Sequence, residues 1–237
     1  PAPLSPALSK LLARLPVQDD GEALRQSLFH SGTHFNPDLL TSEAERRARL
    51  EGVHAALDRA ESLVFLDTES TGGRNGRLIE VALVETDVEQ NVTGGLHFRC
   101  NPHRRSLAGA RRVHGIQDCE LEHCPEFAAR ADELLEAVRG KTVVIHDRTM
   151  DLLWLNRELQ AARPGAPRFE DRCTVVDSFV LARAIPSERR RNGLDALLEW
   201  YELGARGGHH DAYGDAALLS RVFFELWWDL DEWLYGE

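Results

Sequence analysis

The stretch that decides the fold is residues 62–73, Ser62-Leu63-Val64-Phe65-Leu66-Asp67-Thr68-Glu69-Ser70-Thr71-Gly72-Gly73. Its apolar first half predicts a buried β-strand, and two carboxylates end that strand. Because alternate residues of a strand point to the same face, Asp67 and Glu69 are expected to lie side by side. Such a pair can hold hard divalent cations and leaves the following loop free for a substrate. Taken alone, the motif also fits an acidic turn that simply ends a strand.

Strands and helices alternate along the chain that follows this stretch. Further strands are expected over residues 78–84, 95–100, 142–145 and 174–176, and the first three strands should form an antiparallel meander. Helices are expected over residues 125–138 and 149–161, and from residue 211 to beyond residue 224. This alternation predicts an α/β domain with a mixed sheet. The Trp-rich end, residues 226–235, is expected to pack on its own core, with a partner surface as the alternative.

The N-terminal part of the chain has a different pattern. Prolines interrupt the first forty residues, and Ser42-x-x-Glu45 then fits a capping box that opens a helix. Leu50, Val53 and Leu57 recur at helical spacing in that helix. We therefore expect an N-terminal helical extension over residues 1–60 and the main domain over residues 61–237.

Composition limits the class of protein. The chain has 237 residues, 43% of them hydrophobic, which suits one sizeable domain with an extension or two small domains. No apolar run approaches the roughly 20 residues of a membrane span, and the N-terminus lacks a signal-peptide pattern. Four scattered cysteines favour a reduced cytoplasmic protein without structural zinc. The net charge of -11 argues against a sequence-independent coat on nucleic acid, but allows an enzyme that grips phosphates through metal ions.

Two further acidic positions accompany the first pair. Asp151 is expected in the first turn of the helix after a buried strand, where the helix dipole favours a carboxylate. Asp215 lies beside small residues in the C-terminal helix, five residues after His210. The same dipole disfavours imidazolium near a helix N-terminus, which would keep His210 neutral enough to act as a base. Each position alone is explained as well by helix electrostatics or by a surface histidine.

Four carboxylates brought together would repel one another unless cations neutralise them. Mg²⁺ and Mn²⁺ prefer such oxygen ligands, and two ions roughly 3.5–4 Å apart can stabilise both the attacking and the leaving oxygens of a phosphoryl displacement. A neutral histidine beside them can take the proton of an attacking water.

In the order of its motifs, the chain resembles the DnaQ-like DEDDh family of 3′–5′ exonucleases. The motifs are Asp67-Thr68-Glu69-Ser70-Thr71-Gly72, Leu78-Ile79-Glu80-Val81-Ala82, Val113-His114-Gly115-Ile116, His146-Asp147-Arg148-Thr149-Met150-Asp151 and His210-x-Ala212-x-x-Asp215. The match covers about residues 62–225, and several motifs in register are far more specific than one D-x-E. The resemblance implies an RNase H-like fold with a five-stranded mixed sheet flanked by helices.

The resemblance also implies roles for individual residues. Asp67, Glu69, Asp151 and Asp215 match the four carboxylates that hold two divalent cations, Mg²⁺ or Mn²⁺, and His210 matches the general base. Residues expected to meet the 3′-terminal nucleotide are Thr68, Ser70, Thr71, Gly72, His114, His146 and Asp147. Asp147 departs from the family pattern, which usually has asparagine there, and replaces an amide donor with an acceptor near phosphate.

The implied activity is metal-dependent hydrolysis of the 3′-terminal phosphodiester of single-stranded DNA or frayed 3′ ends, in proofreading or repair. An exoribonuclease with the same chemistry is the nearest alternative, because the sequence does not show how the pocket treats a 2′-hydroxyl. A non-catalytic member that binds nucleic acid or a polymerase is a second alternative, and only Asp147 supports it. A DNA polymerase or a second copy of the chain is a possible partner, and a membrane is not expected.

Overall fold

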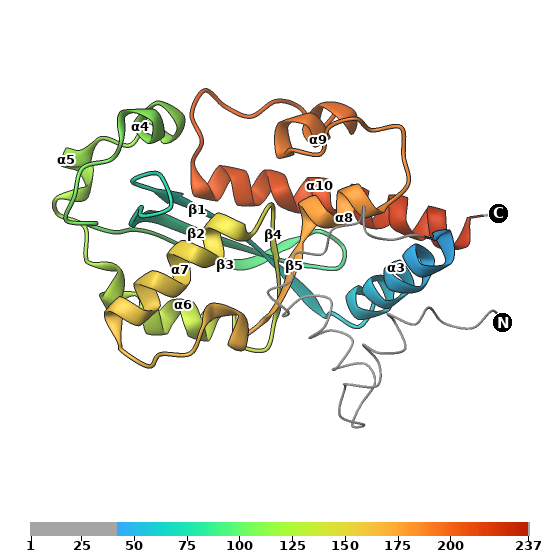
Figure 1. Cartoon of the computed structure of the whole chain (residues 1–237), viewed down its shortest axis with the longest axis horizontal. Coiled ribbons are helices and arrows are strands. Elements are labelled where there is room, and N and C mark those ends of the chain that lie inside the picture. Colours follow the sequence, from blue (N-terminus) through green and yellow to red (C-terminus); the bar gives the residue numbers. More distant parts are fainter. Residues whose placement is uncertain (1–41, 237) are drawn as a thin grey trace.

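The structure of the chain, a computed structural model, describes residues 42–236 (Figure 1). Within these residues a five-stranded sheet has the order β3-β2-β1-β4-β5. Strand β2 pairs antiparallel with β1 and β3, whereas β4 pairs in parallel with β1 and β5. The predicted meander and the mixed sheet are therefore confirmed. The strands are β1 (Ser62–Ser70), β2 (Leu78–Asp87), β3 (Val92–Arg99), β4 (Thr142–Ile145) and β5 (Thr174–Asp177).

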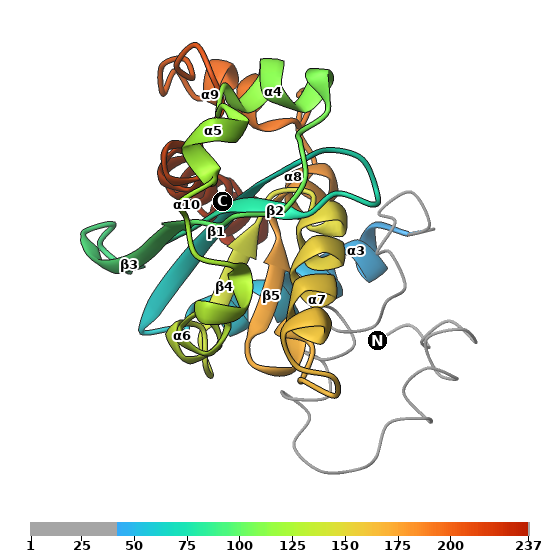
Figure 2. The same ribbon diagram turned by 90° about the vertical axis from the view of Figure 1, so that its left-hand side faces the viewer.

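Helices cover both faces of this sheet (Figures 1 and 2). Leu63 and Phe65 of β1 belong to a core shared with the helices α3, α8, α9 and α10, whereas Val64 and Leu66 belong to a core shared with α6 and α7. The helices are α3 (Glu43–Leu57), α4 (Ala108–His114), α5 (Asp118–Leu121), α6 (Ala131–Ala137), α7 (Thr149–Ala162), α8 (Ser178–Ala184), α9 (Leu194–Trp200) and α10 (Ala212–Tyr235), with 3₁₀ turns η2 (Phe127–Ala129) and η3 (Phe169–Asp171). Strand β1 is buried on both faces, and this explains why its first half is a continuous apolar run.

The predicted N-terminal helix is present as α3. The Ser42 hydroxyl accepts a hydrogen bond from the Glu45 amide at 3.2 Å, as the capping pattern predicted. Leu50, Val53 and Leu57 are buried in the core that contains α10, so α3 packs on the main domain rather than standing apart. Residues 1–41 of the expected extension lie outside the described residues, and the division at residue 60 stays a prediction.

One expected helix differs in the structure. Residues 125–138 were expected as one helix, but they form the turn η2 and the shorter helix α6, separated at Arg130. Arg130 has φ -115° and ψ -3°, outside the range of a regular helix. The break lets the Phe127 ring pack 6.3 Å from the Phe98 ring, centroid to centroid, in the core. Burial of this aromatic ring outweighs the continuous helical hydrogen bonding that the sequence pattern favoured.

The Trp-rich end continues α10 to Tyr235. Trp227 stacks on Phe224 with ring centroids 6.1 Å apart, and Trp233 packs against the same core, whereas Trp228 is exposed. Packing on the chain's own core therefore explains two of these tryptophans. Among residues 42–236, none of the helices combines the length and the apolar character that crossing a bilayer requires.

Candidate active site

Strand alternation delivers the first two carboxylates to the α10 face of the sheet. Asp67 and Glu69 follow Leu63 and Phe65 on that face, and the first turn of α10 brings Asp215 against them. His210 lies just before the helix N-cap, Asp211, with its amide bonded to the Val113 carbonyl at 3.0 Å. Ligand atoms of Glu69, His210 and Asp215 all lie within 4.8 Å of one another, close enough to bind one cation together.

Asp151 reaches the site from the other side of β1. It lies in the first turn of α7, and its Oδ1 accepts a hydrogen bond from the Thr68 hydroxyl at 2.6 Å. Thr68 alternates with Asp67 and Glu69 along the strand, so its side chain faces α7. The Asp151 carboxylate still lies near enough to raise the pKa of Asp67 by electrostatic repulsion. The four predicted carboxylates therefore gather at one end of β1.

Burial and mutual repulsion disfavour the ionised forms of these carboxyl groups. Burial raises the pKa of Glu69 to about 8, and Asp215 and Glu80 add to the rise. Burial likewise raises the pKa of Asp151 to about 7 and that of Asp215 to about 6. The pKa of Asp67 is well above its usual range because of burial first and then the neighbouring carboxylates. Bound cations would relieve this repulsion, and the all-oxygen donors beside one imidazole suit Mg²⁺ or Mn²⁺.

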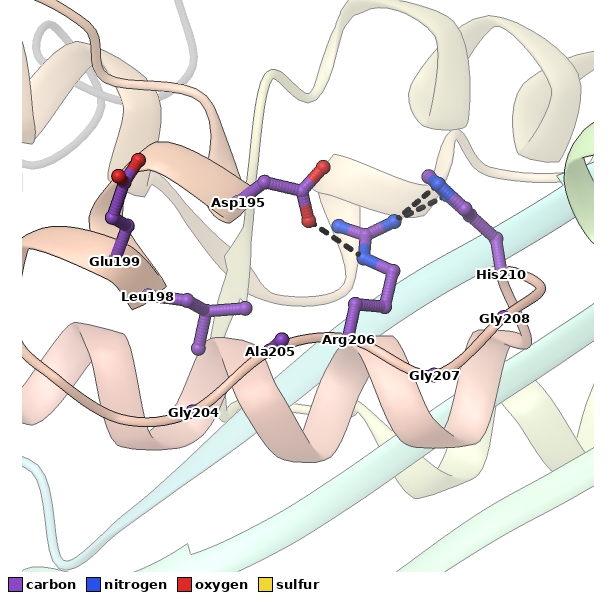
Figure 3. A pocket seen from close by; sticks show the side chains of 9 residues that line it. All are labelled: Asp195, Leu198, Glu199, Gly204, Ala205, Arg206, Gly207, Gly208 and His210. Atoms are coloured by element: carbon purple, nitrogen blue, oxygen red, sulfur yellow. Dashed lines mark hydrogen bonds and ion pairs between the residues drawn. The ribbon is translucent and has the colours of Figure 1, made fainter.

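Two functional neighbours were missed in the sequence. Arg206 places its guanidinium between His210, Asp215 and Asp195 (Figure 3). Glu80, fully buried on β2, accepts a hydrogen bond from the Ala212 amide at 3.0 Å and so fixes the start of α10. Glu80 had a signal in the sequence, because it is the one carboxylate in the strand expected over residues 78–84, whereas Arg206 lies among glycines without a periodic pattern.

The loop after β1 uses its polar side chains internally. The Ser70 hydroxyl accepts from the Gly72 amide at 3.1 Å, and the Thr71 hydroxyl accepts from the Arg77 amide at 3.0 Å. Gly72 has φ +94°, and a Cβ there would lie 2.9 Å from Cβ of Ala110 on α4. Because Thr68, Ser70 and Thr71 are all buried, their hydroxyls do not lie at the surface of this loop.

Helix α7 holds this same loop from the opposite side. Trp154 Nε1 donates to the Gly73 carbonyl at 3.1 Å, and Arg157 donates to the Arg74 carbonyl at 2.7 Å. Arg77 donates to Glu158 with an Nη2–Oε2 distance of 2.8 Å. The helix that carries Asp151 thus also fixes the segment predicted to meet the 3′ end.

Both predicted substrate histidines are largely enclosed. His114 is buried and accepts from the Ile116 amide through Nδ1 at 3.1 Å, and burial lowers its pKa. His146 Nδ1 lies 2.9 Å from the Ser178 hydroxyl, and burial lowers its pKa to about 4. Both rings are therefore neutral near pH 7, and their contact with a nucleotide stays a prediction.

The backbone conformation at residue 147 explains why aspartate is tolerated there. Its φ of +57° is in the left-handed region, where aspartate, asparagine and glycine are tolerated best. The Asp177 carboxylate accepts from the Asp147 and Arg148 amides at 3.2 and 3.3 Å and fixes this turn. The Asp147 side chain is exposed, so the departure from asparagine preserves the turn and changes only what the turn presents.

The chain is similar to known exonucleases over much of its length. The profile of the RNase T exonuclease family matches residues 64–223. The DNA polymerase III subunit epsilon of Rickettsia felis is 34% identical over 168 residues, 69% of this chain and 72% of that protein. The Escherichia coli K12 protein of the same name is 33% identical over 172 residues, 69% of this chain and 70% of that protein.

Solved structures share the fold at lower identity. Escherichia coli exonuclease I in complex with a dA16 oligonucleotide has a TM-score of 0.55 and 21% identity, covering 73% of this chain and 41% of that chain. A 3′-exonuclease that recognises the histone mRNA stem-loop has a TM-score of 0.58 and 14% identity, covering 95% of this chain and 86% of that chain. The predicted RNase H-like fold is confirmed by these neighbours. On the family profile and the epsilon relatives together, the chain belongs to the RNase T exonuclease family, among the DnaQ-like 3′–5′ exonucleases.

Proposed function

We propose that this chain hydrolyses the 3′-terminal phosphodiester of single-stranded DNA or frayed 3′ ends and releases nucleoside 5′-monophosphates. The observation that carries the proposal is the convergence of Glu69, Asp215 and His210 within 4.8 Å, beside two further carboxylates. Exonucleases of this family generally use divalent metal ions, and the donor set here fits them.

The metal ligands in this proposal are Asp67, Glu69, Asp151 and Asp215. Two divalent cations held there would supply stabilisation of charge on the attacking and leaving oxygens of the displacement. Hydrogen bonding to Thr68 orients Asp151, and Glu80 holds the helix start that carries Asp215. The ligands thus come from three elements that are fixed to one another before a substrate binds.

His210 is the proposed general base. Burial and the Arg206 charge lower the pKa of His210, so the ring is neutral near pH 7 and can accept a proton from the attacking water. Its Nδ1 lies 3.4 Å from Asp215 Oδ2, within the same group of ligand atoms. The proposed base therefore lies beside the metal ligand Asp215, where the attacking water would be oriented.

DNA is proposed as the substrate because the epsilon relatives are named as DNA polymerase subunits, and a polymerase is a proposed partner on the same ground. Proofreading or DNA repair would be the setting. A single strand held by its backbone and by stacking is consistent with a loop whose Thr68, Ser70 and Thr71 hydroxyls are buried.

A digest of matched 3′-labelled and 5′-labelled DNA and RNA oligonucleotides tests this proposal. With Mg²⁺ or Mn²⁺, DNA should shorten from the 3′ end, and EDTA should stop the reaction. Asp67→Ala and Asp215→Ala should abolish activity, whereas Asp132→Ala, an exposed aspartate on α6, serves as the matched control. Activity retained in both site variants would contradict the assignment. Faster digestion of RNA than of DNA would identify RNA as the substrate.

A further inference from the structure

Arg206 occupies the place where a cation would meet the catalytic ligands. Its Nη1 lies 2.8 Å from Asp215 Oδ2 and 2.9 Å from His210 Nε2. Its Nε lies 3.1 Å from Asp195 Oδ1 on the opposite side of the guanidinium. Figure 3 shows the guanidinium between Asp195 and His210. Only 13% of the Arg206 side chain is exposed, so this is an enclosed contact rather than a surface ion pair.

The same donor atoms cannot serve Arg206 and a metal ion at once. Asp215 and His210 are two of the three residues whose ligand atoms lie within 4.8 Å of one another. A guanidinium carries only donors, so its contact with Asp215 uses a lone pair that a metal ion would need, and its contact with His210 uses the lone pair that the proposed general base needs. Its positive charge also repels a divalent cation brought to the same ligands.

The loop that carries Arg206 is built to let this side chain move. Residues 203–210 are mostly exposed, and Gly204 has φ +92°. Gly207 and Gly208 follow the arginine, and a Cβ added at either would meet no atom within 4 Å. Beside the guanidinium lies a pocket of about 440 Å³, whose lining includes Asp195, Leu198 and Glu199. Asp195, which lies outside the catalytic set and already contacts Arg206, can therefore retain the guanidinium when it leaves Asp215.

We propose that Arg206 is a tethered cation that neutralises Asp215 and blocks metal binding there until a divalent ion displaces it toward Asp195. Arg206 then lowers the affinity of the site for metal and stabilises the metal-free fold. The inference rests on the proposed metal dependence of the site, and it adds an autoinhibitory contact that the family assignment does not contain.

Direct metal binding tests this contact without relying on activity. Mn²⁺ is titrated by calorimetry into the full chain, into Arg206→Gln and into Arg191→Gln. Arg191 is an exposed arginine that pairs with the exposed Glu199 at 3.2 Å, so its variant removes the same charge without removing a contact to Asp215 or His210. Arg206→Gln should bind Mn²⁺ about tenfold more tightly, the factor that corresponds to about 1.4 kcal/mol. Arg191→Gln should stay within about twofold of the parent chain.

Thermal unfolding supplies a second readout. In EDTA, Arg206→Gln should melt at a lower temperature than the parent, and Mn²⁺ should raise its melting temperature by more than it raises that of the parent. Equal or weaker Mn²⁺ binding by Arg206→Gln overturns the inference and leaves the proposed function standing. An equal gain in Arg191→Gln also overturns it, because the effect would then be general charge. Absence of Mn²⁺ binding in every form would overturn the proposed metal site itself.

Discussion

Two glutamates that face each other across β1 and β2 should respond in opposite ways to the same substitution. Glu69 and Glu80 are direct partners in the antiparallel register. Burial raises the pKa of Glu69 to about 8. Burial alone would raise the pKa of Glu80 too, but hydrogen bonds from the Ala212 amide, Arg99 and His97 outweigh it and lower that pKa. Without metal, Glu69→Gln should stabilise the fold and Glu80→Gln should destabilise it.

The magnitude for Glu69 follows from linkage. Its folded-state pKa of about 8 exceeds its ordinary value of 4.5, so the native state holds the proton more tightly than the unfolded chain does. The resulting penalty is absent below the lower value and complete above the higher one. At about 1.36 kcal/mol per pH unit, the upper bound is roughly 5 kcal/mol. Partial solvent access to Glu69 screens the charge, so we expect a gain of about 1–2 kcal/mol above about pH 8.5.

The expected loss for Glu80→Gln comes from its hydrogen bonds. Glu80 accepts from Arg99 Nε at 2.8 Å, from His97 at 3.1 Å and from the Ala212 amide at 3.0 Å. Hydrogen bonds to charged groups contribute about 1.5–3 kcal/mol each, and glutamine keeps one acceptor, so a loss of about 1–3 kcal/mol is expected.

Thermal unfolding in EDTA at about pH 8.5 measures both variants under one condition. For a chain of this size, about 2–4 °C per kcal/mol predicts that Glu69→Gln melts a few degrees above the parent and Glu80→Gln a few degrees below. Mn²⁺ should stabilise the parent more than Glu69→Gln, because the variant lacks one ligand. Shifts of the same sign in EDTA would refute the reasoning, since the two side chains differ only in their surroundings.

Three further outcomes are expected from the same structure. His210→Ala should lower the hydrolysis rate by about 10²-fold or more, while calorimetry should show a smaller loss of Mn²⁺ affinity. If His209→Ala, at the exposed neighbouring residue, lowered the rate more, His209 and not His210 would be the base. In EDTA the melting temperature of the parent should fall between about pH 6.5 and 8.5, because the folded state keeps protons on its raised-pKa carboxyls, and a rise in that window would contradict the assigned burial. Gly72→Ala should raise KM for oligonucleotides more than it lowers kcat, since its Cβ meets Ala110. The control Gly140→Ala, at a residue with φ +70° and open space around an added Cβ, should only lower stability by about 1 kcal/mol. Equal kinetics in both variants would show that Gly72 is not part of the substrate-binding surface.

The regular elements around the site could be predicted from the sequence because each is an apolar run or a helical repeat with a clear end. Residues 142–145 form β4 as predicted, and the helix expected over residues 149–161 is α7 with one more residue. The helix expected over residues 125–138 could not be predicted correctly, because the position of Phe127 depends on Phe98 from a distant strand. Local periodicity contains no information about such a contact.

The candidate site also has features that the sequence predicts and features that only the folded chain shows. Asp67 and Glu69 share a strand face by local geometry, so their proximity could be predicted from spacing alone. Whether Thr68 and Ser70 would be free or bonded depended on Asp151 and on the turn at Gly72, which only the folded chain shows. Arg206 lies in a glycine-rich loop without periodicity, so no pattern placed its guanidinium beside Asp215.

The charges at this end of the sheet show how the fold separates structural from functional carboxylates. Arg99 and His97 hold the Glu80 carboxylate, which in turn fixes the start of α10. Glu69, its partner in the register, has no such donor and keeps a raised pKa. The contact of Arg206 with Asp215 is intermediate between these two cases. It neutralises charge, but Arg206 belongs to a loop with glycines on either side. The proposed metal site would therefore combine a fixed contact, at Glu80, with one that a metal ion is proposed to displace, at Asp215.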